Sequence, residues 1–165
     1  MFENLKEDWR TYNGDISRRG LWCMVVYRYG NWRYTIKNSV IRKPFSLLYK
    51  ILKVVSEVLT SIELPCEAPV GRRLIIEHAS DVVVSGDAVL GDDVVLRNGV
   101  TIGLRNRGVR GSPKIGNRVD IGAGAKLLGP ITIGDDVLIG ANAVVLSNVP
   151  SGYMAVGNPA RIRPR

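Results

Sequence analysis

Residues 115–150 read IGNRVD, IGAGAK, LLGPIT, IGDDVL, IGANAV and VLSNVP, so an aliphatic residue opens each group of six. These aliphatic positions are Ile115, Ile121, Leu127, Ile133, Ile139 and Val145. A period of six is too short for a helical repeat and too regular for ordinary hairpins, so each group is predicted to form one short strand and a turn. Three groups then make one triangular coil, with the aliphatic residue inside and Gly or Asp-Asp at the corners.

A second series with the same period begins at Val70. Its members are Val70, Ile76 and Val82, then, after a step of eight residues, Leu90, Leu96 and Ile102. Between the two series, residues 103–114 (GLRNRGVRGSPK) break the period and are predicted to project as a loop. Loops of this length tend to be functional, and three arginines suit a site for a charged ligand.

The region before the repeats has a different period. From Glu7 to about Ile62 the apolar residues recur at spacings of three and four, which predicts amphipathic helices. The predicted helix ends are Gly14, Gly20 and Gly30, with a break at Lys43-Pro44. The chain therefore divides into a helical region at 1–62 and a repeat domain at 63–165, which includes the loop and a short C-terminal segment.

Composition and charge narrow the class of protein. The 165 residues are 45% hydrophobic, and the two cysteines have neither metal-ligand spacing nor the density of a disulfide framework. No export signal or long uncharged apolar stretch is found, so we expect a cytoplasmic protein. The net charge of +8 is concentrated in residues 1–60, with eleven Lys and Arg against five Asp and Glu. No nucleic-acid-binding motif accompanies it, which favours a phosphate-bearing ligand or peripheral contact with an anionic membrane at its inner face.

Several features together resemble the hexapeptide-repeat acyltransferases, in particular their serine acetyltransferase branch. They are the six-residue groups, the eight-residue step after the single His, the loop and the ending AVGNPARI at 155–162. Residues 26–32 (VYRYGNW) match the AYRIGHW stretch of that branch, and Glu77-His78-Ala79 matches its Asp-His-Ala or Asp-His-Gly motif. The resemblance implies a mainly β protein, a left-handed parallel β-helix preceded by α-helices. It also implies a homotrimer, with acetyl-CoA in the groove between neighbouring subunits.

The same resemblance assigns the catalytic groups. His78, the only histidine, is the expected base that takes a proton from an acceptor hydroxyl, a role that suits imidazole near neutral pH. Glu63, fifteen positions earlier, stands where the family has an acidic residue that orients the imidazole. The oxyanion is expected to meet a backbone N–H near Gly103 and Leu104.

Acetyl-CoA is the implied co-substrate, and no metal is needed because the thioester is already activated. The expected cofactor-binding residues are Gly122, Ala123, Gly124, Ala125, Gly140, Ala141, Gly157, Pro159, Ala160 and Arg161. Corners of a coil also need small residues for packing alone, so the glycines have two possible explanations.

The acceptor is less well specified. Serine acetyltransferases carry Arg-His-Pro before the next strand, whereas this chain has Gly111-Ser112-Pro113. The pattern is similar to short relatives that O-acetylate sugars in bacterial capsule, exopolysaccharide or lipopolysaccharide assembly. We therefore expect a sugar or lipid-linked oligosaccharide acceptor, with Glu77, Arg110 and Ser112 as candidate contacts.

Three other functions fit parts of the pattern. A serine acetyltransferase of cysteine synthesis would turn over free L-serine, and a nucleotide-sugar N-acyltransferase would need an amine acceptor. A non-catalytic β-helix scaffold would not bind acetyl-CoA. A β-helix carbonic anhydrase requires three zinc-binding histidines, and a single histidine cannot meet that requirement.

Overall fold

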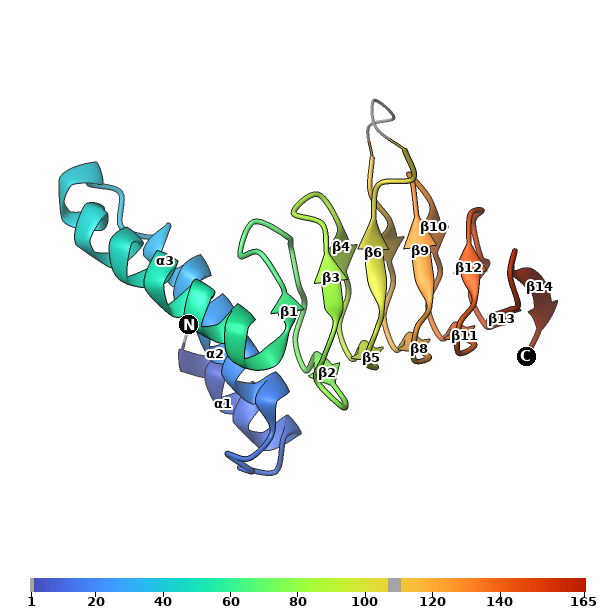
Figure 1. The fold of residues 1–165 in the computed structure, drawn as a ribbon, viewed down its shortest axis with the longest axis horizontal. Helices are drawn as coiled ribbons and strands as arrows, with labels where there is room; N and C mark the ends of the chain where they lie inside the picture. Colours follow the sequence, from blue (N-terminus) through green and yellow to red (C-terminus); the bar gives the residue numbers. More distant parts are fainter. Residues whose placement is uncertain (1, 107–110) are drawn as a thin grey trace.

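A helical region leads into a long β-helix (Figure 1). The computed structural model describes residues 2–106 and 111–165. The helices are α1 (Phe2–Thr11), α2 (Arg19–Arg33) and α3 (Ser39–Thr60). The strands are β1 (Ile62–Glu63), β2 (Ile75–Ile76), β3 (Val82–Val84), β4 (Val89–Leu90), β5 (Val95–Leu96), β6 (Thr101–Gly103), β7 (Lys114–Ile115), β8 (Asp120–Ile121), β9 (Lys126–Leu128), β10 (Thr132–Ile133), β11 (Leu138–Ile139), β12 (Val144–Val145), β13 (Tyr153–Val156) and β14 (Arg161–Pro164).

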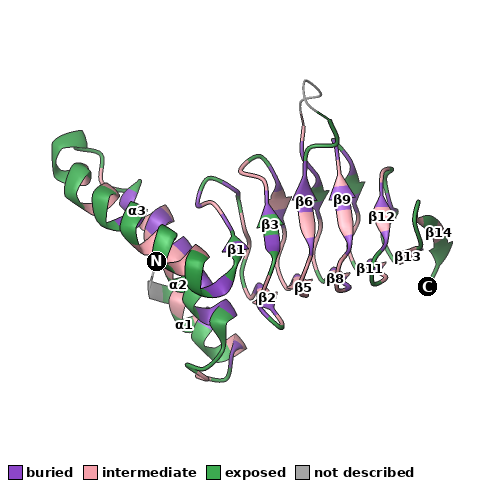
Figure 2. Ribbon diagram, in the orientation of Figure 1, coloured by how far each residue is buried: buried purple, intermediate pink, exposed green. Residues whose placement is uncertain are grey.

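Three sheets form the sides of the β-helix, and within each sheet the coil strands pair in parallel. The orders are β1-β3-β6-β9-β12, β4-β7-β10 and β2-β5-β8-β11-β13, the last extended by antiparallel β14. The coil winds in the left-handed sense as it advances from the helices to the C-terminus (Figure 1). From Ile76 to Val145, every predicted aliphatic position is at most 3% exposed, and Figure 2 shows this core running along the strands. The predicted fold class is confirmed.

The eight-residue step lies elsewhere than the sequence suggested. The sequence predicts it between Val82 and Leu90, but Val84, not Val82, aligns with Ile102 of the next coil. Strand β3 buries both Val82 and Val84, so either residue satisfies the hydrophobic pattern. Val82 pairs instead with Ile62 of the preceding coil. The two additional residues therefore fall between Ile76 and Val84, in the segment that contains His78.

The predicted loop leaves the β-helix between β6 and β7. A regular coil contains 18 residues, as the pairing of Val83 with Thr101 shows. The next coil is seven residues longer, because Thr101 pairs with Lys126, 25 residues later. The extra residues lie outside the coil, as the broken period predicted. The chain returns at Gly111, whose φ of +116° is in the range that favours glycine.

Helix α3 contradicts the predicted break at Lys43-Pro44. It begins after Asn38, whose side chain accepts hydrogen bonds from the N–H groups of Val40 and Ile41, and it continues through Pro44 to Thr60. The carbonyl that loses its partner at Pro44 belongs to Val40, which is 69% exposed, so water can replace that hydrogen bond. None of the helices in the described ranges combines the length and apolar character needed to cross a bilayer.

The glycines of the helical region also differ from expectation. Gly14 follows α1, but Gly20 is the second residue of α2 and Gly30 lies inside it. A Cβ on Gly30 would come within 2.5 Å of the Tyr49 ring and 2.7 Å of Cys66 Cβ. Gly30 is therefore explained by close packing of α2 against its neighbours, not by helix termination.

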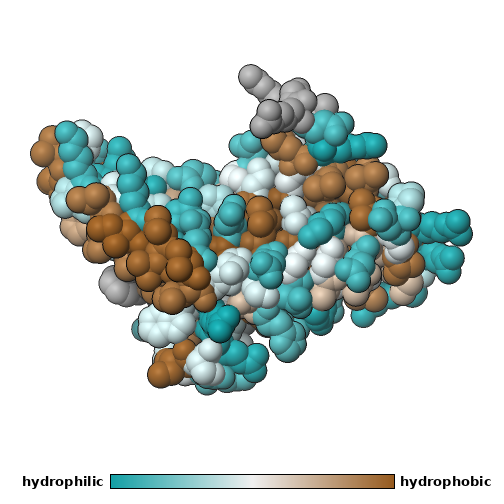
Figure 3. Space-filling view, viewed as in Figure 1, coloured by the Kyte–Doolittle hydropathy of each residue, from teal (hydrophilic) through white to brown (hydrophobic). Residues whose placement is uncertain are grey.

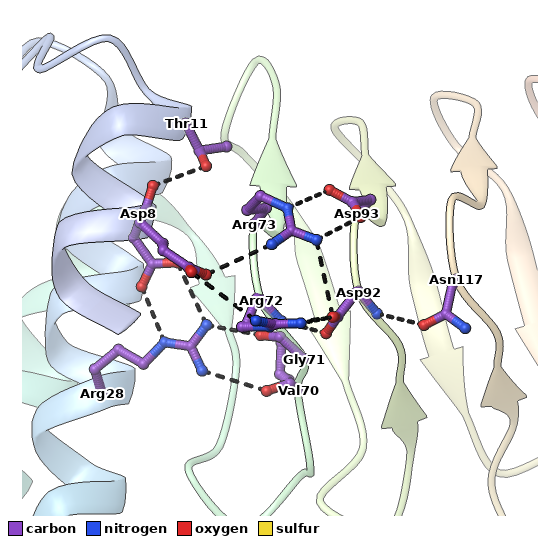
Figure 4. A network of polar contacts seen from close by, with 11 residues as sticks. Asp8, Thr11, Arg28, Val70, Gly71, Arg72, Arg73, Asp92, Asp93 and Asn117 are labelled. Carbon is purple, nitrogen blue, oxygen red and sulfur yellow. Dashed lines mark hydrogen bonds and ion pairs between the residues drawn. The ribbon is translucent and has the colours of Figure 1, made fainter. Parts of the chain in front are cut away.

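A buried ion pair joins the helices to the first coil (Figure 4). Arg28 Nε donates to Asp8 at 2.9 Å, and the remaining guanidinium N–H groups reach the carbonyls of Val70 and Gly71. The Tyr27 hydroxyl donates to the Ala68 carbonyl at 2.7 Å. These contacts, with one continuous apolar core, fix the helices against the β-helix.

Candidate active site

His78 lies in the connection from β2 to β3, which is two residues longer than the equivalent connection from β5 to β6. Its φ is +51°, in the left-handed region that non-glycine residues seldom occupy. The side chain is exposed. Most other left-handed residues of the β-helix recur at equivalent corners of successive coils, whereas His78 lies in the lengthened connection beside the corner residue Asp81. Strained backbone of this kind is concentrated at functional sites, which agrees with the role expected for His78.

The predicted acetyl-CoA residues share one edge of the β-helix with His78. Residues 122–125, 140–141 and 157–160 each follow a strand of the β2-β5-β8-β11-β13 sheet, as His78 does. These turns line up along the lower edge in Figure 1. We call this the His78 edge, defined by His78, Gly99, Gly124 and Asn142. The coil thus brings together residues that are up to about 80 positions apart in the sequence.

Coil packing by itself explains several of these small residues. A Cβ on Gly122 would lie 2.5 Å from the backbone nitrogen of Ala141, and one on Gly140 would lie 2.9 Å from Val156. Gly124 has a φ of +73° and faces Asn142. Ala125 is fully buried, with its carbonyl accepting from Thr101. Ala125 therefore has no exposed atom with which to contact a cofactor.

The end of the same edge is formed by the turn before β14. Asn158-Pro159 is a cis peptide bond, and the Ala160 N–H donates to the Val144 carbonyl at 2.9 Å. Gly157, Pro159 and Arg161 are exposed beside this turn. These residues are therefore accessible for the nucleotide contact that the sequence predicts.

Glu63 does not contact His78 in this structure. It lies on β1 opposite Val83, with its side chain exposed. Within residues 2–106 and 111–165, no hydrogen bond or ion pair joins the two side chains. The orienting role of Glu63 stays a prediction.

Gly103 and Leu104 lie at the opposite edge of the same sheet. His78 precedes β3, whereas Gly103 ends the neighbouring strand β6, so the two are separated by the width of the sheet. At about 3.3 Å per residue, three-residue strands place these edges about 10 Å apart. The Leu104 N–H donates to no partner among the described residues, and its side chain is 49% exposed.

The three candidate acceptor contacts have different surroundings. Glu77 pairs with Arg97 at 3.2 Å, and Arg97 also pairs with Asp120. Ser112 is 6% exposed, and its hydroxyl donates to that of Ser85 at 3.0 Å. It anchors the base of the loop and has little surface for a ligand. Arg110 lies outside the described residues.

Sequence reasoning missed a pair of arginines next to His78. A pocket of about 310 Å³ is lined by Ser17, Arg18 and Arg19 on one side and by Ile76, His78, Ala79 and Ser80 on the other. The arginines precede His78 by about 60 positions, and the helical period around them indicates only a solvent-exposed turn. The packing of α2 on β2 in the structure shows that these arginines line one pocket with His78.

Comparison with known proteins gives consistent relatives. Residues 112–147 match the family described as bacterial transferase hexapeptide (six repeats). The chain is 43% identical over 130 residues to a serine acetyltransferase of Helicobacter pylori (strain ATCC 700392 / 26695), covering 78% of this chain and 75% of that protein. It is 39% identical over 147 residues to the putative colanic acid biosynthesis acetyltransferase WcaB of Escherichia coli (strain K12), covering 86% and 89%.

Solved structures show the same architecture. The crystal structure of serine acetyltransferase from Brucella abortus strain S19 superposes with a TM-score of 0.83 at 29% identity, covering 99% of this chain and 68% of that one. A structure of the same protein in complex with coenzyme A has an equal TM-score.

Proposed function

The chain belongs to the hexapeptide-repeat acetyltransferases, and from this family membership we propose that it O-acetylates a sugar in bacterial polysaccharide assembly. It is an acetyl-CoA-dependent acyltransferase, so the open question is the acceptor. The observation that carries the sugar assignment is the match to the putative colanic acid acetyltransferase, which extends over 89% of that protein. The loop supports it, because Gly111-Ser112-Pro113 lacks the cation and imidazole that would hold an amino acid.

In the proposed reaction His78 removes the proton of the acceptor hydroxyl as its oxygen attacks the thioester carbonyl. A tetrahedral oxyanion forms, and a backbone N–H at the start of the loop, near Leu104, stabilises it. The intermediate collapses with cleavage of the carbon–sulfur bond, and the imidazolium returns the proton to the leaving thiolate. Glu63 would act as a positioning residue by holding the protonated ring.

We further propose that the complete site forms between subunits of a homotrimer. His78 and Gly103 lie at opposite edges of one sheet, so a single subunit does not place base and oxyanion donor around one carbonyl. A neighbouring coil that presents its loop edge to the His78 edge would bring the two together. Acetyl-CoA would then lie along the half-buried turn at Ala123–Gly124, the partly exposed turn at Gly140–Ala141 and the exposed residues of the turn at Gly157–Arg161.

The second candidate is serine O-acetylation, favoured by the 43% identity to the Helicobacter pylori serine acetyltransferase. One experiment distinguishes the two. Thiol released from acetyl-CoA is measured with L-serine and with a capsule-type oligosaccharide, for the wild type and for His78→Ala. Turnover of the oligosaccharide alone supports the sugar acceptor, whereas turnover of L-serine assigns the chain to cysteine synthesis. Full activity of His78→Ala with either acceptor would refute the mechanism.

The third helix supports peripheral attachment to an anionic membrane at its inner, cytoplasmic face. Its apolar face consists of Val40, Ile41, Leu47, Leu48, Ile51, Val54, Val55, Val58 and Leu59, each between 46% and 76% exposed. Figure 3 shows brown side chains gathered over α3. Arg42, Lys43, Lys50 and Lys53 lie on the same helix, whose only acidic residue is Glu57. An apolar face beside a cationic one is typical of helices that lie in the headgroup region of anionic bilayers.

Co-sedimentation with vesicles of phosphatidylcholine alone or with added phosphatidylglycerol tests this attachment. We expect binding to the anionic vesicles that weakens with salt and is lost in the variant L47Q/I51Q/V58Q. Ile16→Gln, which changes an apolar side chain that is 63% exposed but lies outside α3, serves as the control. If the triple variant instead lowers the mass of the assembly in solution, the face joins copies of this chain.

A further inference from the structure

The pocket beside His78 is cationic. Arg18 and Arg19 line one side of it, and the residues that line it include no carboxylate. His78 lines the opposite side. A molecule that enters this pocket therefore meets the candidate base and two guanidinium groups together.

Close packing holds the arginines in place. Gly20 follows them directly, and a Cβ there would come within 2.6 Å of the Ile76 carbonyl and of the Tyr12 hydroxyl. The Ile76 N–H donates to that hydroxyl at 2.8 Å. Because β2 ends at Ile76, this contact fixes the start of α2 two residues from His78.

The two arginines are engaged to different extents. Asp15 accepts hydrogen bonds from the Ser17 N–H at 2.9 Å and from Arg18 Nε at 3.3 Å, so its carboxylate partly neutralises Arg18. Arg19 is exposed and has no ion pair or hydrogen bond from its side chain within the described ranges. Arg19 therefore has its donors available for a ligand.

We propose that Arg18 and Arg19 bind an anionic group of the acceptor, so that the enzyme acetylates an acidic sugar. Guanidinium groups pair in two-pronged geometry with carboxylates and phosphates, and either anion would place a neighbouring hydroxyl toward His78. The anion is thus the carboxylate of a uronic acid or the phosphate of a sugar phosphate. The assignment of this ligand as the acceptor rests on the proposed function, but binding of the anion does not.

A binding experiment tests the site without requiring turnover. His78 is the only histidine, so the Cε1 proton of its imidazole gives a single resonance that reports on the pocket. The shift of this resonance is followed at constant pH and ionic strength while D-glucuronate, inorganic phosphate or neutral D-glucose is added. We expect a saturable shift with at least one anion and none with glucose. The anion that binds more tightly distinguishes the uronic acid from the sugar phosphate.

Variants then assign the effect to the arginines. Arg19→Gln should weaken anion binding by about tenfold, the loss expected for one charge-assisted hydrogen bond, and Arg19→Lys should restore part of it. Arg10→Gln removes the same charge from the helical region at an exposed position outside the pocket and should leave binding unchanged. Three results would overturn the proposal. They are equal weakening of anion binding by Arg10→Gln, a shift with glucose equal to that with an anion, and no saturable shift with either anion.

The proposal and the proposed function can fail separately. Anion binding that depends on Arg19, without acetylation of any sugar, would retain the site and refute the sugar acetyltransferase. In the opposite case, wild type and Arg19→Gln would both acetylate neutral and acidic sugars with the same KM. That result would support the proposed reaction and refute the anion site.

Discussion

Two edges of the β-helix have the same backbone but different side chains. On the edge between the β4-β7-β10 and β2-β5-β8 sheets, Arg73, Asp93, Arg118 and Asp136 occupy left-handed positions with φ between 54° and 60°. We call this the Arg–Asp edge. Arg73 Nε meets Asp93 at 2.6 Å, and Arg118 Nε meets Asp136 at 2.7 Å. On the His78 edge, the equivalent corners carry Asp81, Gly99, Gly124 and Asn142.

This difference separates what the fold requires from what function requires. Every corner of the coil needs a residue that tolerates positive φ, and Asp, Asn, Gly and even Arg satisfy this need. The backbone geometry of a corner therefore does not determine whether its side chain is charged. The corner residues of the Arg–Asp edge pair with one another, whereas the corner residues of the His78 edge are short and make no ion pair in the described ranges, with an exposed imidazole beside them. The small corner residues therefore leave room for a ligand beside His78, where the other edge is filled by arginine and aspartate side chains.

The largest expected effect comes from removing the base at the His78 edge. His78→Ala should lower kcat by about 10²- to 10⁴-fold, the usual contribution of a general base. The melting temperature should not fall, because the exposed side chain makes no described hydrogen bond. Thiol release and a thermal melt on the same preparation check both statements. Arg118→Ala on the Arg–Asp edge should retain full activity, and an equal loss in both variants would indicate a structural effect.

The next largest effect concerns the contact between the helices and the coil. Asp8 is fully buried against Arg28, so Asp8→Leu leaves a buried cation without its counterion and should cost about 3–5 kcal/mol of unfolding free energy. The double variant D8L/R28M removes both charges and should recover part of that loss. Urea denaturation measures the two. Equal stability of the single and double variants would mean that the charge pair itself is not the cause.

A smaller effect should distinguish packing from cofactor binding at the small residues. Gly122→Ala forces a Cβ toward the backbone of Ala141 at 2.5 Å, which should cost about 1–3 kcal/mol of unfolding free energy with no acetyl-CoA present. Gly86→Ala is the matched control, because its Cβ would meet only ordinary contacts at 3.8 Å. If Gly122→Ala is as stable as Gly86→Ala but binds acetyl-CoA poorly, the cofactor is the reason for that glycine.

The sequence predicts the repeats better than the site. A strict period of six places each aliphatic residue inside the coil, and Ile121 and Ile139 are fully buried as expected. The period is ambiguous only where β3 buries both Val82 and Val84, so the insertion around His78 was misplaced. Arg19 and His78 line the same pocket because of how the helices pack on the coil. The periodicity of the sequence does not predict that packing. The continuation of α3 through Pro44 depends on exposure at Val40, which is also a tertiary property.

The smallest effect should appear in acid on the Arg–Asp edge. The hydrogen bond from Arg118 lowers the pKa of Asp136 below its ordinary value of 3.8, and Arg73 does the same for the pKa of Asp93. A lowered carboxyl pKa contributes stability that is complete above the ordinary pKa and is lost as the pH falls through the lowered value. Asp136 is exposed and Asp93 is only half-buried, so solvent screening keeps the contribution small. Asp136→Asn should therefore reduce the decrease in melting temperature between about pH 5 and pH 3, relative to the wild type.

Asp87→Asn, which alters an exposed carboxylate without a described ion pair, should leave that decrease unchanged. An identical acid profile for Asp136→Asn and the wild type would show that the ordered ion pairs of this edge contribute nothing to stability.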